Sequence, residues 1–436
     1  MTTVLVIGGG GREAALVRSL SRSPGVGRLL AAPGNPGIAR DGATCLPVSV
    51  GDRDGLVAAA VEHRVDLAVV GPEAPLVSGL VDMLGAARVR AFGPSSAAAR
   101  VEGSKAYAKE VMESAGVPTA RSALARSRAE AEDALAEHAY PVVLKADGLA
   151  AGKGVIICGD ETEARAALDV FFGERRFGNT GVLIEEFLEG EELSLLALCD
   201  GHRAIPMAPA RDYKRIFDGD QGPNTGGMGS FSPVPGAGDP WDLAATIHQP
   251  VVDELRRRGA PFHGVLYAGL MITADGPRVL EFNCRFGDPE TQAILPRLRS
   301  DLLDLVDRSA RPGGLEGATI EWSDDCAVTV VLASRGYPET SSSGDVIGGL
   351  EEAAATGADV LHAGTAERDG EIVTAGGRVL NVTALGATLD DARERAYAAV
   401  DRIDFDGKQV RRDIARSSNS ALQRSTSSRE GEGITP

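Results

Sequence analysis

The sequence predicts an α/β protein of several domains that begins with a doubly wound parallel sheet and ends with a small α+β domain. The chain has 436 residues, which is too many for one ordinary core. Its 43% hydrophobic residues, 54 glycines and 23 prolines are typical of a soluble α/β enzyme. Over the first hundred residues, short apolar runs alternate with segments of helical spacing, which is the pattern of a parallel sheet covered by helices.

The first domain is expected to span residues 1–101. Its opening run, VLVIG, is continuously apolar and precedes a helical segment, REAALVRSLSRS. Later apolar runs end in glycine or proline turns, as buried parallel strands do. The expected strands are 4–8, 28–35, 65–75 and 90–95.

The central part of the chain is expected to span 102–325 and to contain a smaller α+β unit at about 119–189. A helix over 102–118 ends at a glycine and a proline, and a second helix over 130–139 leads into an apolar strand. Residues 263–290 predict a hairpin that turns at an Asp-Gly pair.

Residues 326–416 predict the last domain, with strands at 327–334 and 378–386 and a helix at 389–403. The following tail, 417–436, is rich in Ser, Arg and Gly and is expected to be disordered.

Charge and cysteine usage restrict the possible partners and the compartment. The net charge of −17 disfavours a nucleic-acid partner, whose phosphates would be repelled. No uncharged apolar run reaches membrane-spanning length, and the N-terminus lacks the features of a signal peptide. The five cysteines are scattered without metal-binding spacing, so reduced thiols and a cytoplasmic location are expected.

Lysine is scarce: only six of the 45 basic residues are lysine, and the rest are arginine. Lysines beside glycine loops are therefore less easily explained as surface residues. Five of the six fall in or near the motifs below: Lys105, Lys109, Lys145, Lys153 and Lys214.

The segment YPVVLKADGLAAGKGVII (140–157) places a loop of small residues and two lysines between two expected strands. A P-loop is excluded, because only three residues separate Gly148 from Gly152 and a glycine follows Lys153. A hairpin of this kind can instead close over a polyphosphate, with backbone N–H groups and lysines facing the phosphate oxygens. A flexible surface hairpin is the alternative.

Two acidic segments complete a candidate nucleotide site. VLIEEFLEGEELS (182–194) can offer backbone groups to an adenine edge and a carboxylate to ribose, although a solvated acidic turn would look the same. In VLEFNCRFGDPETQ (279–292), Glu281 and Asn283 share one face of a strand. Two oxygen ligands suit Mg²⁺ shared with phosphates, and Arg285 continues that face. The alternative is a strand with an incidental polar face.

Two further segments face a second substrate. The long glycine-rich loop at 211–233 carries Asp212 and Lys214, and loops of this length in compact enzymes are usually functional. GGGGREA (8–14) follows the first strand and opens the first helix, where N–H groups hold phosphates. The match to a dinucleotide fingerprint is loose, and Asn35 stands where an acidic residue would bind ribose, so a phosphate or sugar-phosphate site is expected instead of a nicotinamide cofactor.

Several of these motifs together resemble the ATP-grasp ligases: ADGLAAGKGV, IEEFLEGEE, GPNTGGMG and EFNCRFGDPETQ. Within that class the chain is similar to the phosphoribosylamine–glycine ligase family of purine synthesis. The similarity runs from about residue 3 to residue 414 and includes GGRE, APGN, VGPEAPLV, HAGT and GGRVL.

The resemblance implies ATP-dependent ligation of glycine to 5-phosphoribosylamine through glycyl phosphate, with Mg²⁺ or Mn²⁺, by a monomer that binds neither nucleic acid nor membrane. It implies ATP contacts at Lys105, Lys145, Gly152, Lys153, Gly154, Glu185, Glu186, Phe187, Leu188 and Glu192. It implies metal ligation by Glu281 and Asn283, and catalytic contacts by Arg285, Lys214 and Asp212. The residues expected to bind substrate are Gly10, Gly11, Arg12, Glu13, Asn35, Glu73, Asp288, Pro289 and Glu290.

The chain departs from the family pattern at three places. Ala14 and Tyr213 stand where the family usually has histidine, and the sequence after residue 414 differs. The two substitutions are expected to affect amine-substrate contacts and not the ATP chemistry. Other interpretations are a different ATP-grasp carboxylate–amine ligase, a nucleotide-binding protein that has lost catalysis, and a Rossmann dehydrogenase.

Overall fold

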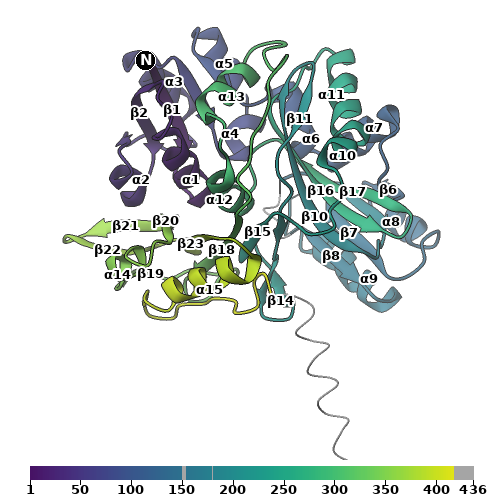
Figure 1. Cartoon of the computed structure of the whole chain (residues 1–436). Helices are drawn as coiled ribbons and strands as arrows, with labels where there is room; N and C mark the ends of the chain where they lie inside the picture. The colour runs from purple at the N-terminus through teal and green to yellow at the C-terminus, as the bar shows by residue number, and fades with distance from the viewer. Residues whose placement is uncertain (150–153, 179, 417–436) are drawn as a thin grey trace, which may run out of the picture.

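The computed structural model describes residues 1–149, 154–178 and 180–416. Figure 1 shows the N-terminal sheet at upper left, the central and lid sheets at right, and the C-terminal elements below, with helix α12 (Glu290–Ile294) near the middle. The predicted α/β class, with a doubly wound first domain, is confirmed.

The N-terminal sheet is entirely parallel and has the order β3-β2-β1-β4-β5. Side chains of β1 alternate between two cores: Leu5 and Ile7 pack on one face, and Val4 and Val6 on the other. Its strands are β1 (Thr2–Gly8), β2 (Val26–Pro33), β3 (Thr44–Cys45), β4 (Leu67–Val70) and β5 (Arg90–Phe92). Its helices are α1 (Gly11–Leu20), α2 (Pro36–Arg40), α3 (Arg53–Glu62), α4 (Glu73–Val77), α5 (Leu80–Ala86) and α6 (Ser96–Gly103).

The central sheet is antiparallel, in the order β11-β10-β16-β17. The predicted hairpin is confirmed, and Gly276 at its turn has a φ of +109°, which glycine adopts without strain. The strands are β10 (Glu191–Asp200), β11 (Ala204–Pro206), β16 (His263–Thr273) and β17 (Gly276–Asn283). The helices are α7 (Lys105–Ala115), α10 (Pro240–Thr246), α11 (His248–Arg257), α12 and α13 (Leu302–Ser309).

The lid is a four-stranded antiparallel sheet in the order β6-β9-β7-β8, with its own core around Val142, Leu144 and Ile184. A separate core lets a unit of this kind move as one body. Its elements are β6 (Ser122–Ala125), α8 (Arg128–Leu135), β7 (Val142–Ala146), β8 (Val155–Cys158), α9 (Glu161–Leu168), a π-helical turn (Asp169–Gly173) and β9 (Val182–Glu186).

The C-terminal elements form a five-stranded sheet, β12-β15-β18-β23-β20, and a three-stranded sheet, β19-β22-β21. Two strands of the first sheet come from the long loop of the central segment: β12 (Arg211–Asp212) and β15 (Gly229–Ser232). The sequence did not predict this sharing, which places Asp212 beside the C-terminal domain. The remaining elements are β13 (Arg215–Phe217), β14 (Gln221–Asn224), β18 (Cys326–Ala333), β19 (Ser343–Val346), α14 (Leu350–Ala354), β20 (Asp359–His362), β21 (Thr365–Arg368), β22 (Glu371–Ala375), β23 (Arg378–Gly386) and α15 (Leu389–Val400).

The predicted helix over 102–118 is wrong at its start, because α6 ends at Gly103 and a new helix begins at Lys105. Ser104 has an extended backbone between them, and its hydroxyl accepts a hydrogen bond of 3.1 Å from the Tyr107 N–H. Serine at this position satisfies an unpaired N–H of the first turn, which favours a new helix over continuation. At the other end, Gly116 is left-handed and terminates α7 as predicted.

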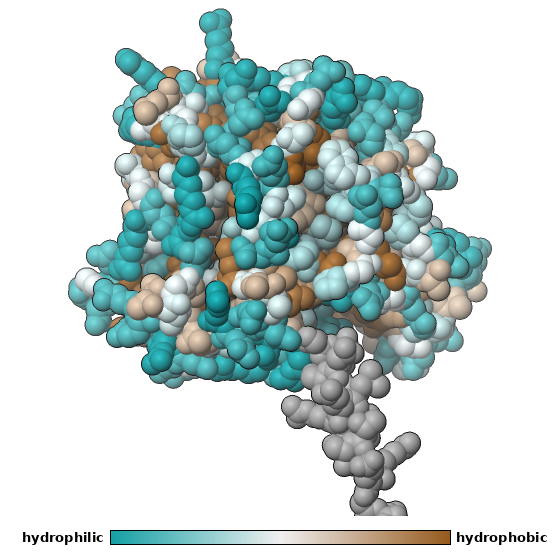
Figure 2. Space-filling model, in the orientation of Figure 1, coloured by the Kyte–Doolittle hydropathy of each residue, from teal (hydrophilic) through white to brown (hydrophobic). Residues whose placement is uncertain are grey.

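One face of the molecule is drawn in Figure 2. The face in Figure 2 is mostly hydrophilic, with hydrophobic residues visible mainly in the furrows between polar side chains. In the part of the chain that the structure describes, no helix has the length and apolar character needed to cross a bilayer. All five cysteines are free, as expected.

One buried histidine makes the stability of the fold dependent on pH. His248 is fully buried at the start of α11, 3.2 Å from the Leu195 carbonyl oxygen, and burial lowers its pKa to about 4. The unfolded chain takes up this proton near pH 6.5 and the folded chain only near pH 4. The contribution of neutral His248 to the free energy of unfolding is therefore complete above pH 6.5 and is lost as the pH falls towards 4.

Between pH 7 and pH 4, the free energy of unfolding of the wild type should fall by about 3 kcal/mol more than that of His248→Gln, because the variant has no imidazole to take up a proton on unfolding. The measurement is urea denaturation at several pH values. His202→Gln, at an exposed position, is the matched control. Parallel pH dependence of wild type and His248→Gln would contradict the prediction.

Candidate active site

The predicted nucleotide-binding residues meet where the lid touches the central sheet, and a buried carboxylate organises them. Glu185 on β9 is 2% exposed, and its two oxygens lie 2.7 Å from Lys145 Nζ and 2.9 Å from Lys109 Nζ. Lys145 also donates to the Leu280 carbonyl oxygen at 3.0 Å. The Glu185 carboxylate therefore holds both lysines and positions Lys145, and the contact of residue 185 with adenine stays a prediction.

Lys109 is the residue of this group that the site prediction omitted. It lies on α7 and donates to Thr119 Oγ1 at 2.9 Å and to the Ala120 carbonyl at 2.8 Å, as well as pairing with Glu185. It thus connects the central helix α7 to the base of the lid. The scarcity of lysine was the available signal for its importance.

The two residues directly after β7, Asp147 and Gly148, are anchored to the N-terminus of α7. Lys105 Nζ donates to the Gly148 carbonyl at 2.9 Å, and the Asp147 carboxylate accepts from Ser104 Oγ at 3.1 Å and from the Ala106 N–H at 3.2 Å. Burial, reinforced by the charge of Lys145, lowers the pKa of Lys105, although nearby carboxylates oppose this. Two predicted contacts, Gly152 and Lys153, lie outside the described residues; Gly154 pairs with Ala146 at the start of β8.

The connection from β9 to β10 carries the other predicted ATP contacts. The Glu186 carboxylate accepts from the Arg121 N–H at 2.8 Å, while Phe187 is exposed and Leu188 is half-buried. Glu192, predicted to bind ribose, lies with its Oε2 atom 2.6 Å from Lys214 Nζ. The start of β10 in the central sheet therefore contacts the long glycine-rich loop.

The predicted metal ligands lie at the end of β17. Phe282 is buried in the core, so Glu281 and Asn283 on either side of it share the opposite face. Burial raises the pKa of Glu281, but the positive charges of Lys214, Lys145 and Lys105 outweigh it and lower the pKa overall. No group of three or more His, Cys, Asp or Glu side chains placed to hold a metal occurs among the described residues. Two oxygen ligands fit an ion such as Mg²⁺ that takes its other ligands from phosphate and water.

Asp212 and Lys214 lie beside this pair in a concentration of carboxylates. Burial raises the pKa of Asp212 to about 8, and the negative charges of Glu290, Glu192 and Glu281 add to the shift, while Lys214 opposes it. Burial would lower the pKa of Lys214, but Glu192 and Asp212 raise it well above its ordinary value. Lys214 is therefore a permanent cation at neutral pH.

Arg285 joins the central segment to the N-terminal domain. Its Nε lies 3.4 Å from Glu73 Oε2, one terminal nitrogen lies 3.3 Å from Glu102 Oε1, and the same nitrogen donates to Asn283 Oδ1 at 3.2 Å. Glu102 was not predicted; its other oxygen accepts from the Cys284 N–H at 2.7 Å. Burial would raise the pKa of Glu73, but Arg285 and Arg12 lower it overall.

The glycine-rich loop after β1 packs tightly against the C-terminal half of the chain. The Gly10 N–H donates to Glu13 Oε2 at 2.7 Å, and Arg12 Nε donates to Glu13 Oε1 at 2.6 Å. A Cβ at Gly11 would overlap the Asn381 side chain and approach Gln292 Nε2 to 2.8 Å. The lack of space for a Cβ explains why residue 11 is glycine, whether or not a ligand also binds there.

Asp288 faces the same loop, since a Cβ at Gly10 would lie 3.7 Å from its Oδ2 atom. Its carboxylate accepts from Gln292 Nε2 at 2.7 Å and pairs with Arg378 at 3.1 Å. Arg378 also donates to the Asp288 and Gly226 carbonyl oxygens, and Gly227 packs on Pro289. The site prediction missed Arg378, although GGRVL contributed to the resemblance.

Asn35 has a mainly structural environment. Its amide nitrogen donates to the carbonyl oxygens of Gly9 and His362, both at 2.9 Å, and its oxygen caps α2 by accepting from the Ile38 N–H at 2.9 Å. It therefore fixes the glycine-rich loop against the C-terminal domain. Direct contact with substrate stays a prediction for this residue.

The two positions that depart from the family pattern, Ala14 and Tyr213, have well-packed side chains. Ala14 is 1% exposed in the core beneath α1. The Tyr213 ring lies against Phe231 and beneath the Arg411 guanidinium, and its hydroxyl accepts from the Ala415 N–H at 3.0 Å. Both side chains pack against other parts of the protein, and their effect on amine-substrate contacts stays a prediction.

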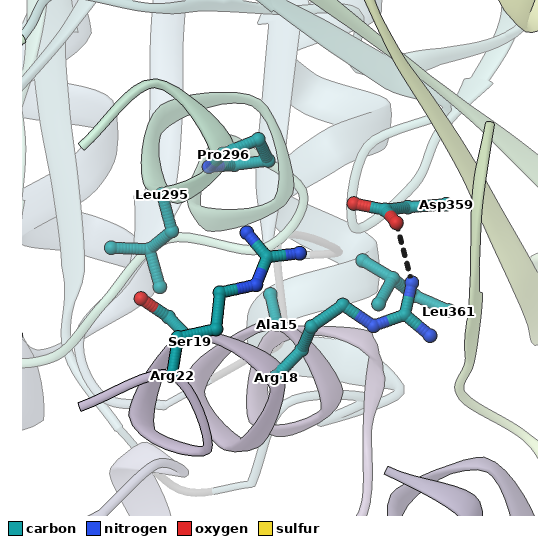
Figure 3. A pocket seen from close by; sticks show the side chains of 8 residues that line it. All are labelled: Ala15, Arg18, Ser19, Arg22, Leu295, Pro296, Asp359 and Leu361. Carbon is teal, nitrogen blue, oxygen red and sulfur yellow. Dashed lines mark ion pairs between the residues drawn. The ribbon is translucent and has the colours of Figure 1, made fainter. Parts of the chain in front are cut away.

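A small pocket lies away from these residues, between α1, the turn after α12 and β20 (Figure 3). Arg18 crosses it to Asp359 at 2.8 Å and also pairs with Asp41. Its cavity volume is about 10 Å³, which is room for about one water molecule. The pocket is therefore an interdomain contact and not a substrate site.

The three-part fold, with a lid, paired lysines and the oxygen-bearing side chains of Glu281 and Asn283 at a strand end, defines an ATP-grasp enzyme. The chain matches three domain families of phosphoribosylglycinamide synthetase: the N domain over residues 2–102, the ATP-grasp (A) domain over 103–291 and the C domain over 327–417. The chain belongs to the phosphoribosylglycinamide synthetase family, whose curated relatives are named phosphoribosylamine–glycine ligase.

The relatives are similar over almost their whole length. That of Streptomyces coelicolor is 52% identical over 94% of this chain and 98% of its own, and that of Caldanaerobacter subterraneus is 47% identical over 94% and 99%. The crystal structure of the ligase from Thermotoga maritima has a TM-score of 0.83 at 34% identity, covering 94% of this chain and all of that one. An ADP complex of N5-carboxyaminoimidazole ribonucleotide synthetase, 19% identical with a TM-score of 0.63, covering 92% of this chain and 96% of that one, shares the fold.

We expect Lys109→Met to raise the KM for ATP about tenfold, because Glu185 would then bind Lys145 alone and more tightly. The KM for glycine should change by less than about twofold. Lys408→Met, which removes the remaining lysine near the C-terminal end, is the matched control. An unchanged KM for ATP in a folded Lys109→Met variant would disprove the positioning role.

Proposed function

We propose that this chain ligates glycine to 5-phosphoribosylamine at the expense of ATP, giving glycinamide ribonucleotide, ADP and phosphate for purine synthesis. One structural observation supports this proposal in addition to family membership. The segment 281–290 bears the metal-ligand pair at one end and residues that face the glycine-rich loop at the other. A nucleotide and a sugar phosphate bound on the two sides would meet at Arg285.

The reaction needs positioning and charge neutralisation and no protein nucleophile. A glycine carboxylate oxygen attacks the γ-phosphorus, the bond to the β-phosphate oxygen breaks, and ADP leaves. The amine of 5-phosphoribosylamine then attacks the acyl carbon, the carbon–oxygen bond to phosphate breaks, and the amine loses a proton. Lys105, Lys145 and Arg285 supply fixed positive charge for the oxygens that gain negative charge.

We assign Glu281 and Asn283 to a divalent ion, Mg²⁺ or Mn²⁺. When bound, such an ion neutralises the phosphate oxygens of the nucleotide. Glu281 has its pKa lowered by three lysines, so it remains ionised and able to ligate throughout the neutral range. Asn283 is kept in orientation by its hydrogen bond from Arg285.

The sugar-phosphate side is assigned to the loop after β1 and the turn after β17. The backbone N–H groups at the start of α1 and the buried Arg12 favour a phosphate there. We propose the same substrate contacts that the sequence predicts. For Asn35, whose amide already bonds Gly9, His362 and Ile38, substrate contact stays a prediction. The domain boundaries at 101 and 325, the monomeric state and the cytoplasmic location stay predictions.

The central test is ADP release with Mg²⁺, ATP, glycine and phosphoribosylamine generated in situ, with each component omitted in turn. We expect release only when glycine and the amine are both present. Turnover with a different acid or amine would move the assignment to another ATP-grasp ligase, and no turnover at any salt concentration would indicate lost catalysis.

We expect Glu281→Gln to raise the half-saturating Mg²⁺ concentration by about 10- to 100-fold, because the ion loses its charged ligand. Calorimetric titration of Mg²⁺ and Mn²⁺ into the ADP complex measures this without turnover and ranks the two ions. Glu254→Gln, which breaks ion pairs with Arg257 and Arg258 at the end of α11, is the control. Equal metal affinity in wild type and Glu281→Gln would show that the site lies elsewhere.

A further inference from the structure

The last described residues of the chain lie along the glycine-rich loop at 211–233. Residues 410–416, which we call the C-terminal strap, contain no helix or strand. Arg411 in this strap has the largest fully buried side chain among the described residues, and that side chain is 0% exposed. Arginine is rarely buried to this degree unless it is paired, so its partners indicate what it holds together.

Arg411 binds the strap and the loop at the same time. Its Nε and one terminal nitrogen donate to the two carboxylate oxygens of Asp413 in the strap, at 2.8 Å and 2.7 Å. The other terminal nitrogen donates to the Arg215 carbonyl oxygen at 3.0 Å and to Asp220 Oδ1 at 2.9 Å, both in the loop. The guanidinium carbon also lies 4.9 Å from the centroid of the Tyr213 ring. All three nitrogens are therefore used within the protein.

Backbone N–H groups add further bonds between the two segments. The Gly219 N–H donates to Asp413 Oδ2 at 2.8 Å, and the Arg412 N–H donates to Asp218 Oδ1 at 2.7 Å. The loop contains five glycines, whose backbone is costly to order, and the bond at Gly219 holds a residue with a left-handed φ of +67°. The strap thus orders a part of the loop that its own sequence leaves flexible.

The strap grips the loop on both sides of Lys214, which the sequence predicts to be catalytic. The residue before it, Tyr213, contacts the Arg411 guanidinium through its ring and the Ala415 N–H through its hydroxyl. The residue after it, Arg215, offers its carbonyl oxygen to Arg411. A shift of Arg411 would therefore move both chain neighbours of Lys214.

Stability alone is a weak explanation for this buried ionic group. Removing a guanidinium and its carboxylates from water is costly, and apolar side chains of similar volume often stabilise a fold equally well. The charged group adds fixed geometry, because a planar guanidinium donates its hydrogen bonds in a few set directions.

We propose that Arg411 is a positioning residue of the ligation reaction. By joining the C-terminal strap to the glycine-rich loop, it fixes Lys214 at the reaction centre. The inference rests on the proposed function for the role of Lys214. Arg411 itself acts through Tyr213 and Arg215 and donates no bond to the reacting groups.

The test measures kcat for ADP release per nucleotide-binding site, with the sites counted by calorimetric titration with ADP. We expect Arg411→Met to lower this kcat about 10- to 100-fold, because a displacement of about 1 Å can cost that much. The KM for ATP should change by less than about threefold. Arg411→Lys, which keeps the charge, should restore part of the loss.

Counting the sites separates positioning from stability. A contact that only stabilises the fold would reduce the number of binding sites or the Tm and leave kcat per site unchanged. Arg412→Met removes the neighbouring guanidinium and its ion pair with Asp401 at the end of α15. It is the matched control and should keep kcat per site within about twofold of wild type.

A double-mutant cycle tests the route through Lys214. Residues that act as a unit have non-additive effects, so Arg411→Met should lower kcat by less than about threefold in a Lys214→Met background. Single-turnover ADP formation with enzyme in excess gives the comparison where steady-state rates are too slow. Additive losses would overturn the positioning of Lys214.

Other outcomes also decide the proposal. An unchanged kcat per site in folded Arg411→Met, or an equal loss in Arg412→Met, would overturn it. If Arg411→Met does not fold, Asp218→Ala decides: it removes an exposed bond between loop and strap and should lower kcat per site about 2- to 5-fold, and an unchanged value would overturn the proposal.

The proposed function fails on a different result. Wild-type ADP release that needs neither glycine nor the amine would overturn that function, while the effect of Arg411→Met on this release would still decide the positioning role. No turnover under any condition would overturn both.

Discussion

The buried guanidinium of Arg285 is the interaction on which the geometry of the site depends. It is the point where β17, the α6 carboxylate of Glu102 and the α4 carboxylate of Glu73 are held together. Removing any one partner would leave a buried charge unbalanced, so the contact also fixes how the N-terminal sheet sits against the central sheet. The proposed metal ligand Asn283 and the proposed acceptor side therefore keep one relative position.

The positive groups that face the nucleotide side have partners within the protein. Lys145 and Lys109 share Glu185, Lys105 bonds the Gly148 carbonyl, and Lys214 pairs with Glu192. Binding a triphosphate would exchange these partners for phosphate oxygens, so no lysine would pass through an unpaired buried state. This arrangement would let so acidic a chain receive an anionic substrate, because most of its few lysines are concentrated where we propose that the phosphates bind.

The sequence was sufficient for the parallel first sheet and the hairpin at Gly276, because apolar periodicity and glycine turns are local signals. It also singled out Lys105, Lys145 and Glu281, which the structure brings together, while their binding roles stay predictions. It failed where tertiary contacts decide. Ser104 separates two helices in a segment that the sequence predicts as one helix. The carboxylate of Glu185 forms ion pairs with two lysines from separate elements. Lys109, Glu102 and Arg378 were missed as members of the site because their partners are distant in sequence.

The pairing of β12 and β15 with β18 has a consequence for how this protein can be divided. Because the central segment supplies two strands of the C-terminal sheet, a fragment cut at residue 325 would expose unpaired backbone on both sides of the cut. Such fragments are expected to associate with each other or to aggregate before either folds alone. A split reporter or a chimaera with a related enzyme would therefore need to exchange the 211–233 loop and the C-terminal domain as one unit.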